Sequence, residues 1–276
     1  MSERSEHIVY IRPRSSWASL DLGEFWAARE LMYFLTWKEL KVRYKQTAIG
    51  VLWVVLQPIV TTIIFAVVFS EVSKFDSPGI PYPLVVLSGL LIWLFMSNAI
   101  MFGSNSLVGA SDLVTKIYFP RLMLPLAPIF AGSIDLVVGL VVLIIALLVY
   151  GIGFSVNMIA APLFLAMAAV LASAIGILTA ALNVKFRDVK FALPFLLQIW
   201  MFASPIFYPI EILSPGARYV LSFNPLSGIV SGFRSAIFGG PFDWRLIGEA
   251  GVISVLLLVM SVLVFKRMED SFADHI

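Results

Sequence analysis

Residues 49–70 read IGVLWVVLQPIVTTIIFAVVFS, a run in which no side chain carries a charge. The hydrocarbon core of a bilayer is about 30 Å thick, so a helix needs roughly 20 apolar residues to cross it. The run is long enough for one crossing, and comparable apolar stretches recur as far as Phe265. The sequence therefore predicts a polytopic membrane protein.

The rest of the chain supports an all-α membrane protein with six transmembrane helices. Of the 276 residues, 60% are hydrophobic and only 13% are charged, which leaves too little polar surface to coat a soluble globule. An even number of crossings places both termini on one side of the membrane. The predicted spans are residues 49–71, 84–105, 122–150, 160–182, 191–208 and 245–265.

Lys and Arg residues set the orientation of these spans. Fifteen of the 19 fall on the side of the N-terminus, eight of them before the first span. The positive-inside rule places that side in the cytoplasm, and no secretory signal peptide is expected. Both termini are therefore expected to be cytoplasmic. The opposite loops are expected to hold Lys74, Arg218, Arg234 and Arg245.

The segment before the first span divides into two parts. Residues 1–25 are polar, and we expect a cytoplasmic extension with little structure of its own. Residues 26–48 are expected to form an amphipathic helix in the headgroup layer, where aromatics and snorkelling lysines are favoured. The alternative is that they are only the polar start of the first span. The apolar stripe holds Tyr33, Trp37, Leu40 and Tyr44, and the strip beside it holds Lys38, Lys41 and Lys45.

Between the second and third spans, Ser111 can N-cap a short amphipathic helix that Pro120 closes. Ile117, Tyr118 and Phe119 are unusually apolar for an exposed loop, so they favour a docking surface on the cytoplasmic side. An ordinary connecting loop is the alternative.

Residues 204–240 are hydrophobic but are broken repeatedly by Pro and Gly, so no unbroken piece reaches bilayer length. We expect two short re-entrant helices, at 217–223 and 226–238, whose broken backbone is covered by neighbouring protein. A seventh full span is the alternative, but it would place Lys266 and Arg267 outside, against the charge rule.

Two features of the apolar segments concern how the helices pack against one another. Ala168, Ala172, Gly176 and Ala180 repeat every four residues, as do Gly228, Gly232 and Ala236 in the broken region, and small residues at this spacing permit close helix packing. Asp135 is the only acid that we place near mid-membrane. An intramembrane acid marks a functional site or hydrogen-bonds a neighbouring helix, and the sequence leaves both readings open.

Several classes of chemistry are disfavoured. The sequence lacks a G-x-x-x-x-G-K-[ST] phosphate loop, so ATP-driven work requires another subunit. With no Cys and only His7 and His275, both in the polar tails, disulfides and His or Cys metal sites are not expected. The acids show no paired arrangement in a membrane cleft of the kind that a glycosyl or phosphoryl transferase would use, so a membrane enzyme is disfavoured. A proton-coupled carrier usually needs several intramembrane ionisable groups, so a single Asp argues weakly against that class.

Five segments in order resemble the membrane subunits of type-2 ABC exporters, in the branch that exports polysaccharides. The resemblance extends from about Leu31 to Phe265. The segments are WKELKVRYKQTAIGVLWVVLQP at 37–58, KIYFPRL at 116–122, NVKFRDV at 183–189, SPIFYP at 204–209 and the Asn-Pro pair at 224–225.

The resemblance implies a homodimer with two cytoplasmic ABC ATPase subunits, which bind ATP and Mg, in a bacterial inner membrane. This chain would be a permease, not an enzyme, with no cofactor of its own and no nucleic-acid partner. The cargo implied is a polyprenyl-diphosphate-linked glycan, first of all O-antigen. Capsule or teichoic-acid export, drug or small-molecule export, and a membrane-embedded transferase acting on a lipid-linked sugar are the alternatives.

The same resemblance assigns site residues and domains. Residues 49–265 would be the transmembrane domain, and residues 266–276 a cytoplasmic tail. Tyr33, Trp37, Lys38, Lys41, Arg43, Tyr44 and Lys45 would form the gate for the lipid diphosphate, and Ser111, Asp112, Lys116, Ile117, Tyr118 and Phe119 the ATPase coupling helix. Aromatic faces suit sugar rings, although belt or core packing is the alternative. The glycan path would include Tyr82, Trp93, Phe95, Phe102, Trp200, Phe202, Phe207 and Tyr208.

Overall fold

The computed structural model describes residues 22–45, 50, 52–68 and 79–272. The predicted extension up to residue 21, residues 46–48 of the predicted amphipathic helix, residues 49, 51 and 69–71 of the first span, Lys74 and the last four residues of the tail lie outside the described residues. Residues 22–25 of the extension, expected to have little structure, are helical. The helices are α1 (Leu22–Ala27), α2 (Arg29–Tyr44), α3 (Leu52–Val68), α4 (Tyr82–Asn105), α5 (Ser111–Lys116), α6 (Met123–Val149), α7 (Ala161–Lys185), α8 (Val189–Phe202), α9 (Pro215–Ser222), α10 (Pro225–Phe238) and α11 (Trp244–Glu269), with 3-10 turns η1 (Val108–Ala110), η2 (Val156–Ala160) and η3 (Ile210–Ile212).

The predicted spans coincide with six apolar helices. Four of them, α4, α6, α7 and α11, are long and apolar enough to cross a membrane. The other two, α3 and α8, have 17 and 14 residues. At 1.5 Å per residue these reach about 26 and 21 Å, short of the hydrocarbon thickness. The helical fold is confirmed for the described residues, four of the predicted spans are candidates by length and composition, and the six-crossing topology stays a prediction.

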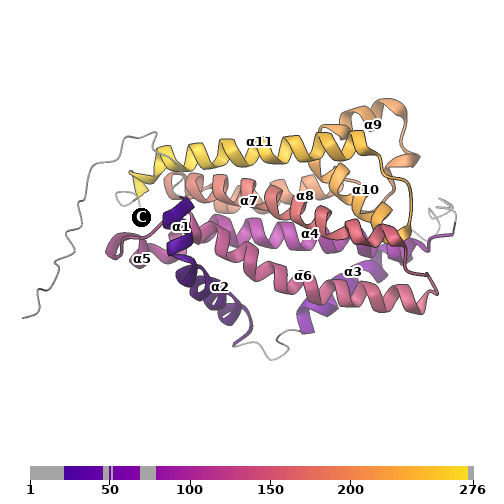
Figure 1. The fold of residues 1–276 in the computed structure, drawn as a ribbon, viewed down its shortest axis with the longest axis horizontal. Helices are drawn as coiled ribbons and strands as arrows, with labels where there is room; N and C mark the ends of the chain where they lie inside the picture. Colours follow the sequence, from indigo (N-terminus) through magenta and orange to yellow (C-terminus); the bar gives the residue numbers. More distant parts are fainter. Residues whose placement is uncertain (1–21, 46–49, 51, 69–78, 273–276) are drawn as a thin grey trace, which may run out of the picture.

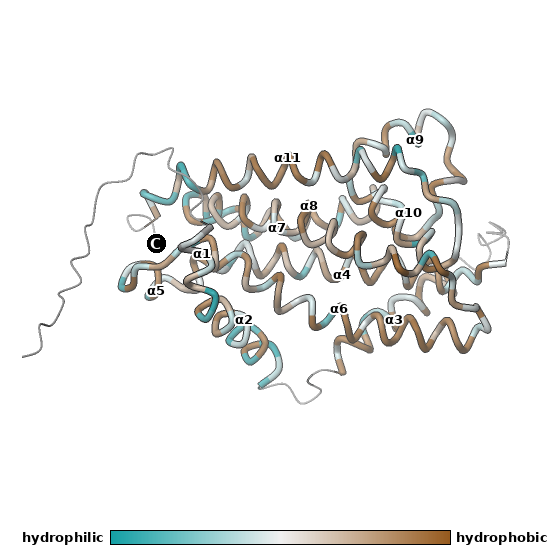
Figure 2. The backbone as a smooth tube through the Cα atoms, viewed as in Figure 1, coloured by the Kyte–Doolittle hydropathy of each residue, from teal (hydrophilic) through white to brown (hydrophobic). Residues whose placement is uncertain are grey.

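Helix α4 lies at the centre of the bundle, between α6 and α7, while α11 runs along α7 (Figure 1). In the most apolar stretch of each helix, 78% of the α4 residues are buried, compared with only 22% of the α11 residues. The outer helices are apolar along most of their length (Figure 2), and α11 exposes Val252, Leu256 and Leu263. An apolar exterior of this kind requires a lipid environment.

Small residues allow α4 and α7 to approach closely. Ala168, Ala172 and Ala180 are fully buried on α7. A Cβ atom built on Gly103 of α4 would lie 3.5 Å from the Cα of Gly176. The predicted small-residue ridge is therefore confirmed as a packing surface.

The broken region forms two short helices, close to the predicted ranges. Ser214 caps α9 by accepting a hydrogen bond from the amide of Ala217, and Asn224 caps α10 through the amide of Leu226. On α10, a Cβ at Gly228 would lie 2.5 Å from the carbonyl oxygen of Leu246 in α11. The close packing predicted there is confirmed, whereas membrane re-entry stays a prediction.

The short helix after α4 differs from the expected one. Helix α5 ends at Lys116, and Ser111 is its first residue, because the turn η1 runs directly into it and puts Ala110 at the cap position. The predicted Ser111 cap is wrong. Figure 1 places α1, α5 and the last turn of α11 at one end of the bundle, with α9 at the other. Arg121 joins the loop after α5 to α11 by donating to the carbonyl of Glu269 at 2.6 Å.

Candidate functional site

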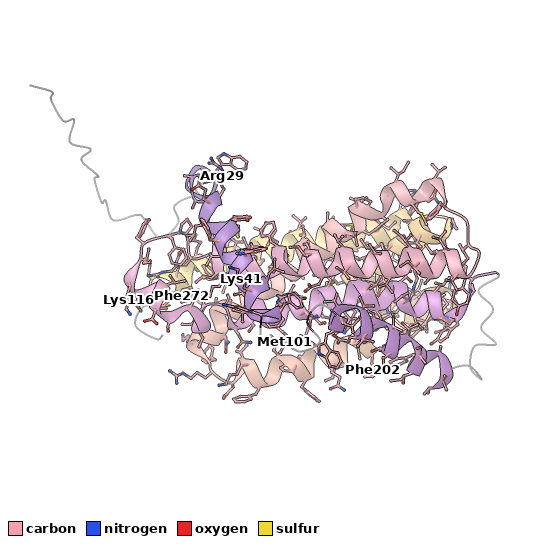
Figure 3. All side chains as sticks on the ribbon, turned by 90° about the horizontal axis from the view of Figure 1, so that it is seen from below. Arg29, Lys41, Met101, Lys116, Phe202 and Phe272 are labelled. Atoms are coloured by element: carbon pink, nitrogen blue, oxygen red, sulfur yellow. The ribbon has the colours of Figure 1, made fainter. Side chains whose placement is uncertain are left out.

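Helix α2 slants away from the bundle and carries the predicted gate residues (Figure 1). Its apolar side chains Leu35 and Leu40 are buried, whereas Tyr33 and Trp37 are exposed. Lys38, Lys41 and Lys45 are exposed as well, and Figure 3 shows Lys41 on this helix. One side of α2 thus packs on protein and the other exposes aromatic and cationic side chains, so Leu40 does not share the environment of Tyr33 and Trp37 as the predicted stripe required. The place of α2 in the headgroup layer stays a prediction.

The end of α2 is tied to the middle of α6 through Asp135. Arg43 donates from Nη1 to Asp135 Oδ2 at 2.8 Å, and the Tyr44 hydroxyl donates to Oδ1 of the same carboxylate. The exposed fraction is 9% for the Arg43 side chain and 20% for that of Asp135. Asp135 therefore does hydrogen-bond a neighbouring helix, one of the two readings that the sequence left open.

Further contacts hold Arg43 and Tyr44 in place. The Arg43 guanidinium lies over the Phe102 ring at 4.2 Å, and its Nη2 is 3.4 Å from the carbonyl oxygen of Pro128. Burial, followed by the adjacent Asp135, raises the pKa of the Tyr44 hydroxyl well above its ordinary value. Tyr44 therefore keeps its proton and acts as a donor at neutral pH.

Beside this network is a cavity of about 360 Å³ between α2, α3, α4 and α6. Its polar lining consists of Arg43, Tyr44, Asp135, Gln57 and Asn98, among apolar side chains. Within the described residues, no group of three or more His, Asp or Glu side chains could hold a metal ion. The donors in the cavity suit a ligand that presents hydrogen-bond acceptors.

The apolar tip after α5 is only partly free of the bundle. Tyr118 is 83% exposed and Ile117 is 57% exposed. Phe119 instead packs against the core of its own chain at that end. Asp112 and Lys116 form an exposed ion pair of 2.7 Å, and Figure 3 shows Lys116 at the end of the molecule. The surface open to a partner is therefore Ile117 and Tyr118.

The aromatic residues predicted to line a glycan path fall into three groups by burial. Trp93, Phe95 and Phe207 are buried in this chain. Trp93 packs edge-on against Trp200 at 5.8 Å, and Trp200 donates to the Asn224 side chain at 3.0 Å. Tyr82, Trp200 and Tyr208 are half-buried, while Phe102 and Phe202 are exposed. The assignment of these residues to a glycan path stays a prediction.

Arg234 was expected on the outer side, within the short helix predicted at 226–238, and it lies in α10, where its burial was not foreseen. Its guanidinium donates to the backbone carbonyls of Pro205, Ile206 and Tyr208, at 2.6–3.0 Å, and to that of Val85 in α4 at 3.0 Å. Irregular backbone at membrane depth needs such internal partners. The proline-rich sequence at 204–209 predicted irregular backbone, but it did not reveal which donor would satisfy it.

Comparison with known proteins identifies the family of this chain. The family model for ABC-2 type transporters matches residues 30–238, from α2 through α10. The chain belongs to the ABC-2 type transporter family. The resemblance found in the sequence is thereby confirmed, and the matched residues include α2, α9 and α10.

Curated relatives cover almost the whole chain. The O-antigen export system permease protein RfbA of Myxococcus xanthus is 27% identical over 92% of this chain and 98% of its own length. RfbA of Klebsiella pneumoniae is 23% identical over 89% and 94%. The polysialic acid transport protein KpsM of Escherichia coli is 26% identical over 85% and 92%. Together with the apolar helices, these relatives indicate a multi-pass inner membrane permease.

Proposed function

We propose that this chain is the membrane subunit of an ATP-driven exporter of polyprenyl-diphosphate-linked polysaccharide, with O-antigen as the cargo. Two of the relatives named above are O-antigen export permeases. Of the three relatives, the one from Myxococcus xanthus aligns with the largest share of this chain, 92%. The single observation that carries the proposal is α2, whose exposed lysines are on the same helix as Arg43 and Tyr44, two polar residues that line the cavity, in a member of this family.

The energy for export would come from a separate ABC ATPase. The sequence has no phosphate loop, so ATP would be bound by a partner. The partner's groove would take Tyr118 and Ile117, the exposed apolar residues at the α5 end. A two-fold dimer of this chain would close a path that one copy only half surrounds, with one ATPase docked on each copy.

The cationic side of α2 would receive the carrier lipid. A diphosphate is too polar to enter hydrocarbon unassisted, and each cation near an anionic membrane surface contributes about 1 kcal/mol. Lys38, Lys41 and Lys45 are exposed and would attract the diphosphate, while Tyr33 and Trp37 would keep the helix at headgroup depth. Arg43 would contact the diphosphate at the cavity.

Cell-surface polysaccharide tests this function. A strain that lacks this chain should accumulate lipid-linked polysaccharide inside the cytoplasmic membrane, and the restored gene should return the polymer to the surface. A second strain carries a Lys38→Gln, Lys41→Gln, Lys45→Gln variant in place of the restored gene, and this variant should insert normally but export poorly. If the deleted strain displays its polymer unchanged, the cargo is not a surface polysaccharide.

A cargo other than O-antigen is supported by the name of one relative, and the name of another leaves the cargo open. KpsM transports polysialic acid, by its name, and YadH of Escherichia coli, an inner membrane transport permease, is 25% identical over 79% of this chain. Chemical analysis of the accumulated lipid-linked material separates these possibilities. An O-antigen repeat supports the proposal, whereas a capsule polymer or no glycan at all favours one of the alternatives.

A further inference from the structure

Arg43 has more hydrogen-bonding capacity than its present partners use. One Nη nitrogen meets Asp135 at 2.8 Å, whereas the other has only a long contact of 3.4 Å with the Pro128 carbonyl. Its Nε is buried and has no hydrogen-bond partner among the described residues. A guanidinium presents five donors in a planar fork, so one carboxylate contact and one long carbonyl contact leave part of that fork underused.

The acceptor that holds Arg43 resembles part of a phosphate. A carboxylate and a phosphate both match the guanidinium fork, and both accept short, charge-assisted hydrogen bonds. A diphosphate carries more charge and more oxygens than one carboxylate. It could therefore satisfy the Nε and Nη2 donors that Asp135 leaves open, in a location where burial strengthens electrostatic attraction.

The surroundings provide room for this replacement. Arg43, Tyr44 and Asp135 all line the 360 Å³ cavity, together with the amides of Gln57 and Asn98. The Asp135 side chain keeps 20% of its surface exposed, so a displaced carboxylate can be hydrated there. The exposed lysines of α2 lie on the same helix and can deliver an anion to the cavity.

From these contacts we propose that the Asp135 carboxylate occupies a diphosphate site in the empty protein, and that the cargo's diphosphate displaces it from Arg43 and Tyr44. The proposal rests on the proposed function and adds the site and its internal competitor. The displacement also has a mechanical consequence, because Arg43 and Tyr44 are what tie the end of α2 to Asp135 of α6. Binding of the cargo headgroup would release this end of the gate helix.

The competition can be measured with the full-length chain in lipid nanodiscs, using farnesyl diphosphate as the probe and farnesol as the uncharged control. Asp135→Asn removes the competing charge and keeps the size of the side chain. Because a site that is occupied most of the time by an internal competitor binds correspondingly more weakly, Asp135→Asn should bind the probe about tenfold more tightly than the wild type. Glu249→Gln is the matched control, since Glu249 also pairs with an arginine, Arg245 at 2.9 Å, but on α11.

A second measurement does not depend on any Asp135 variant. The chain has no Cys, so spin labels can be placed uniquely at Phe34 of α2 and Val137 of α6, which are both exposed and do not line the cavity. In the otherwise unaltered protein, farnesyl diphosphate should lengthen and broaden the distance between the labels, while farnesol should not. The labelled protein must first be shown to bind the probe.

The outcomes distinguish a failure of the Asp135 displacement from a failure of the diphosphate gate itself. If the wild type and Asp135→Asn bind the diphosphate equally well, or the label distance ignores bound diphosphate, the displacement is refuted and the exporter function stands. If Asp135→Asn does not fold, the label distance decides alone. If neither protein binds farnesyl diphosphate better than farnesol, the diphosphate gate fails along with the displacement. Inorganic diphosphate as an added probe tells whether the lipid tail contributes to binding.

Discussion

Arg43 of α2 and Asp135 of α6 are 92 positions apart in the sequence, yet Nη1 and Oδ2 lie 2.8 Å apart. The exposed fractions of the two side chains, 9% and 20%, make this a largely buried ion pair. Breaking such a pair from one side is costly, because the remaining group keeps its charge without a counter-ion. Together with the hydrogen bond from Tyr44 to the same carboxylate, the pair therefore joins α2 to α6.

Removal of one partner should destabilise the protein more than removal of both. We expect Arg43→Met alone to lower the free energy of unfolding by about 3 kcal/mol, because the Asp135 carboxylate then keeps its charge with only the partial hydration that its 20% exposed surface allows. The double variant Arg43→Met, Asp135→Leu should recover most of that loss. Unfolding in detergent, followed for both single variants and the double variant, measures the coupling. Strictly additive losses would show that the pair contributes no interaction energy.

The same arginine should affect export in graded steps. Arg43→Lys keeps the charge but loses the planar fork, so export should fall partially, whereas Arg43→Ala should impair it severely with the complex still assembled. The alternative is that these cations only set topology, which the remaining cytoplasmic Lys and Arg would maintain. Polymer at the cell surface provides the readout. Normal export by a correctly inserted Arg43→Ala, Lys45→Ala variant would decide for that alternative.

Tyr118 should be an anchor for the ATPase. Truncation of an interface anchor often costs more than about 1 kcal/mol, so Tyr118→Ala should weaken assembly or uncouple ATP hydrolysis from export. Tyr219→Ala is the matched control, because Tyr219 is also exposed, at 61%, but lies on α9 at the opposite end. Co-purification of the ATPase and its hydrolysis rate are the measurements. Equal behaviour of the two variants would remove Tyr118 from the interface.

Gly89 of α4 should not tolerate a side chain. A Cβ there would lie 2.5 Å from the Ile206 carbonyl oxygen and 2.9 Å from an Arg234 nitrogen, so it would push apart the contacts that hold the irregular loop. We expect Gly89→Ala to destabilise by about 1–3 kcal/mol. Gly248→Ala on α11 meets no atom within 4 Å and should be neutral or stabilising. Thermal unfolding of the two variants checks the difference, and similar midpoints would contradict the packing described for this loop.

Local sequence patterns predicted much of the fold. Uninterrupted apolar runs located the six apolar helices, and the proline and glycine breaks located α9 and α10 to within two residues. Small residues every four positions identified the face of α7 that packs on α4. These features were predictable because helix length, helix breaking and close helix approach depend on residues near each other in the chain.

Pairings between distant segments could not be predicted in the same way. Asp135 was recognisable as an intramembrane acid, but eight cations precede the first span, and only the packing of α2 against α6 selects Arg43. Likewise, the burial of Arg234 was not foreseen because its carbonyl partners depend on the path of residues 205–208. Burial of Trp93 and Phe95 also depends on how the helices assemble.

Transport in a purified system is the most direct test of the central claim, that this chain exports a lipid-linked polysaccharide only when an ATPase drives it. The chain and its ATPase would be reconstituted together in liposomes loaded with the lipid-linked polymer, and its appearance on the far leaflet would be followed with a polymer-specific lectin. We predict translocation that requires ATP and both subunits, and that stops with an ATPase unable to hydrolyse ATP. Translocation by this chain alone, or ATP hydrolysis without any movement of polymer, would contradict the account.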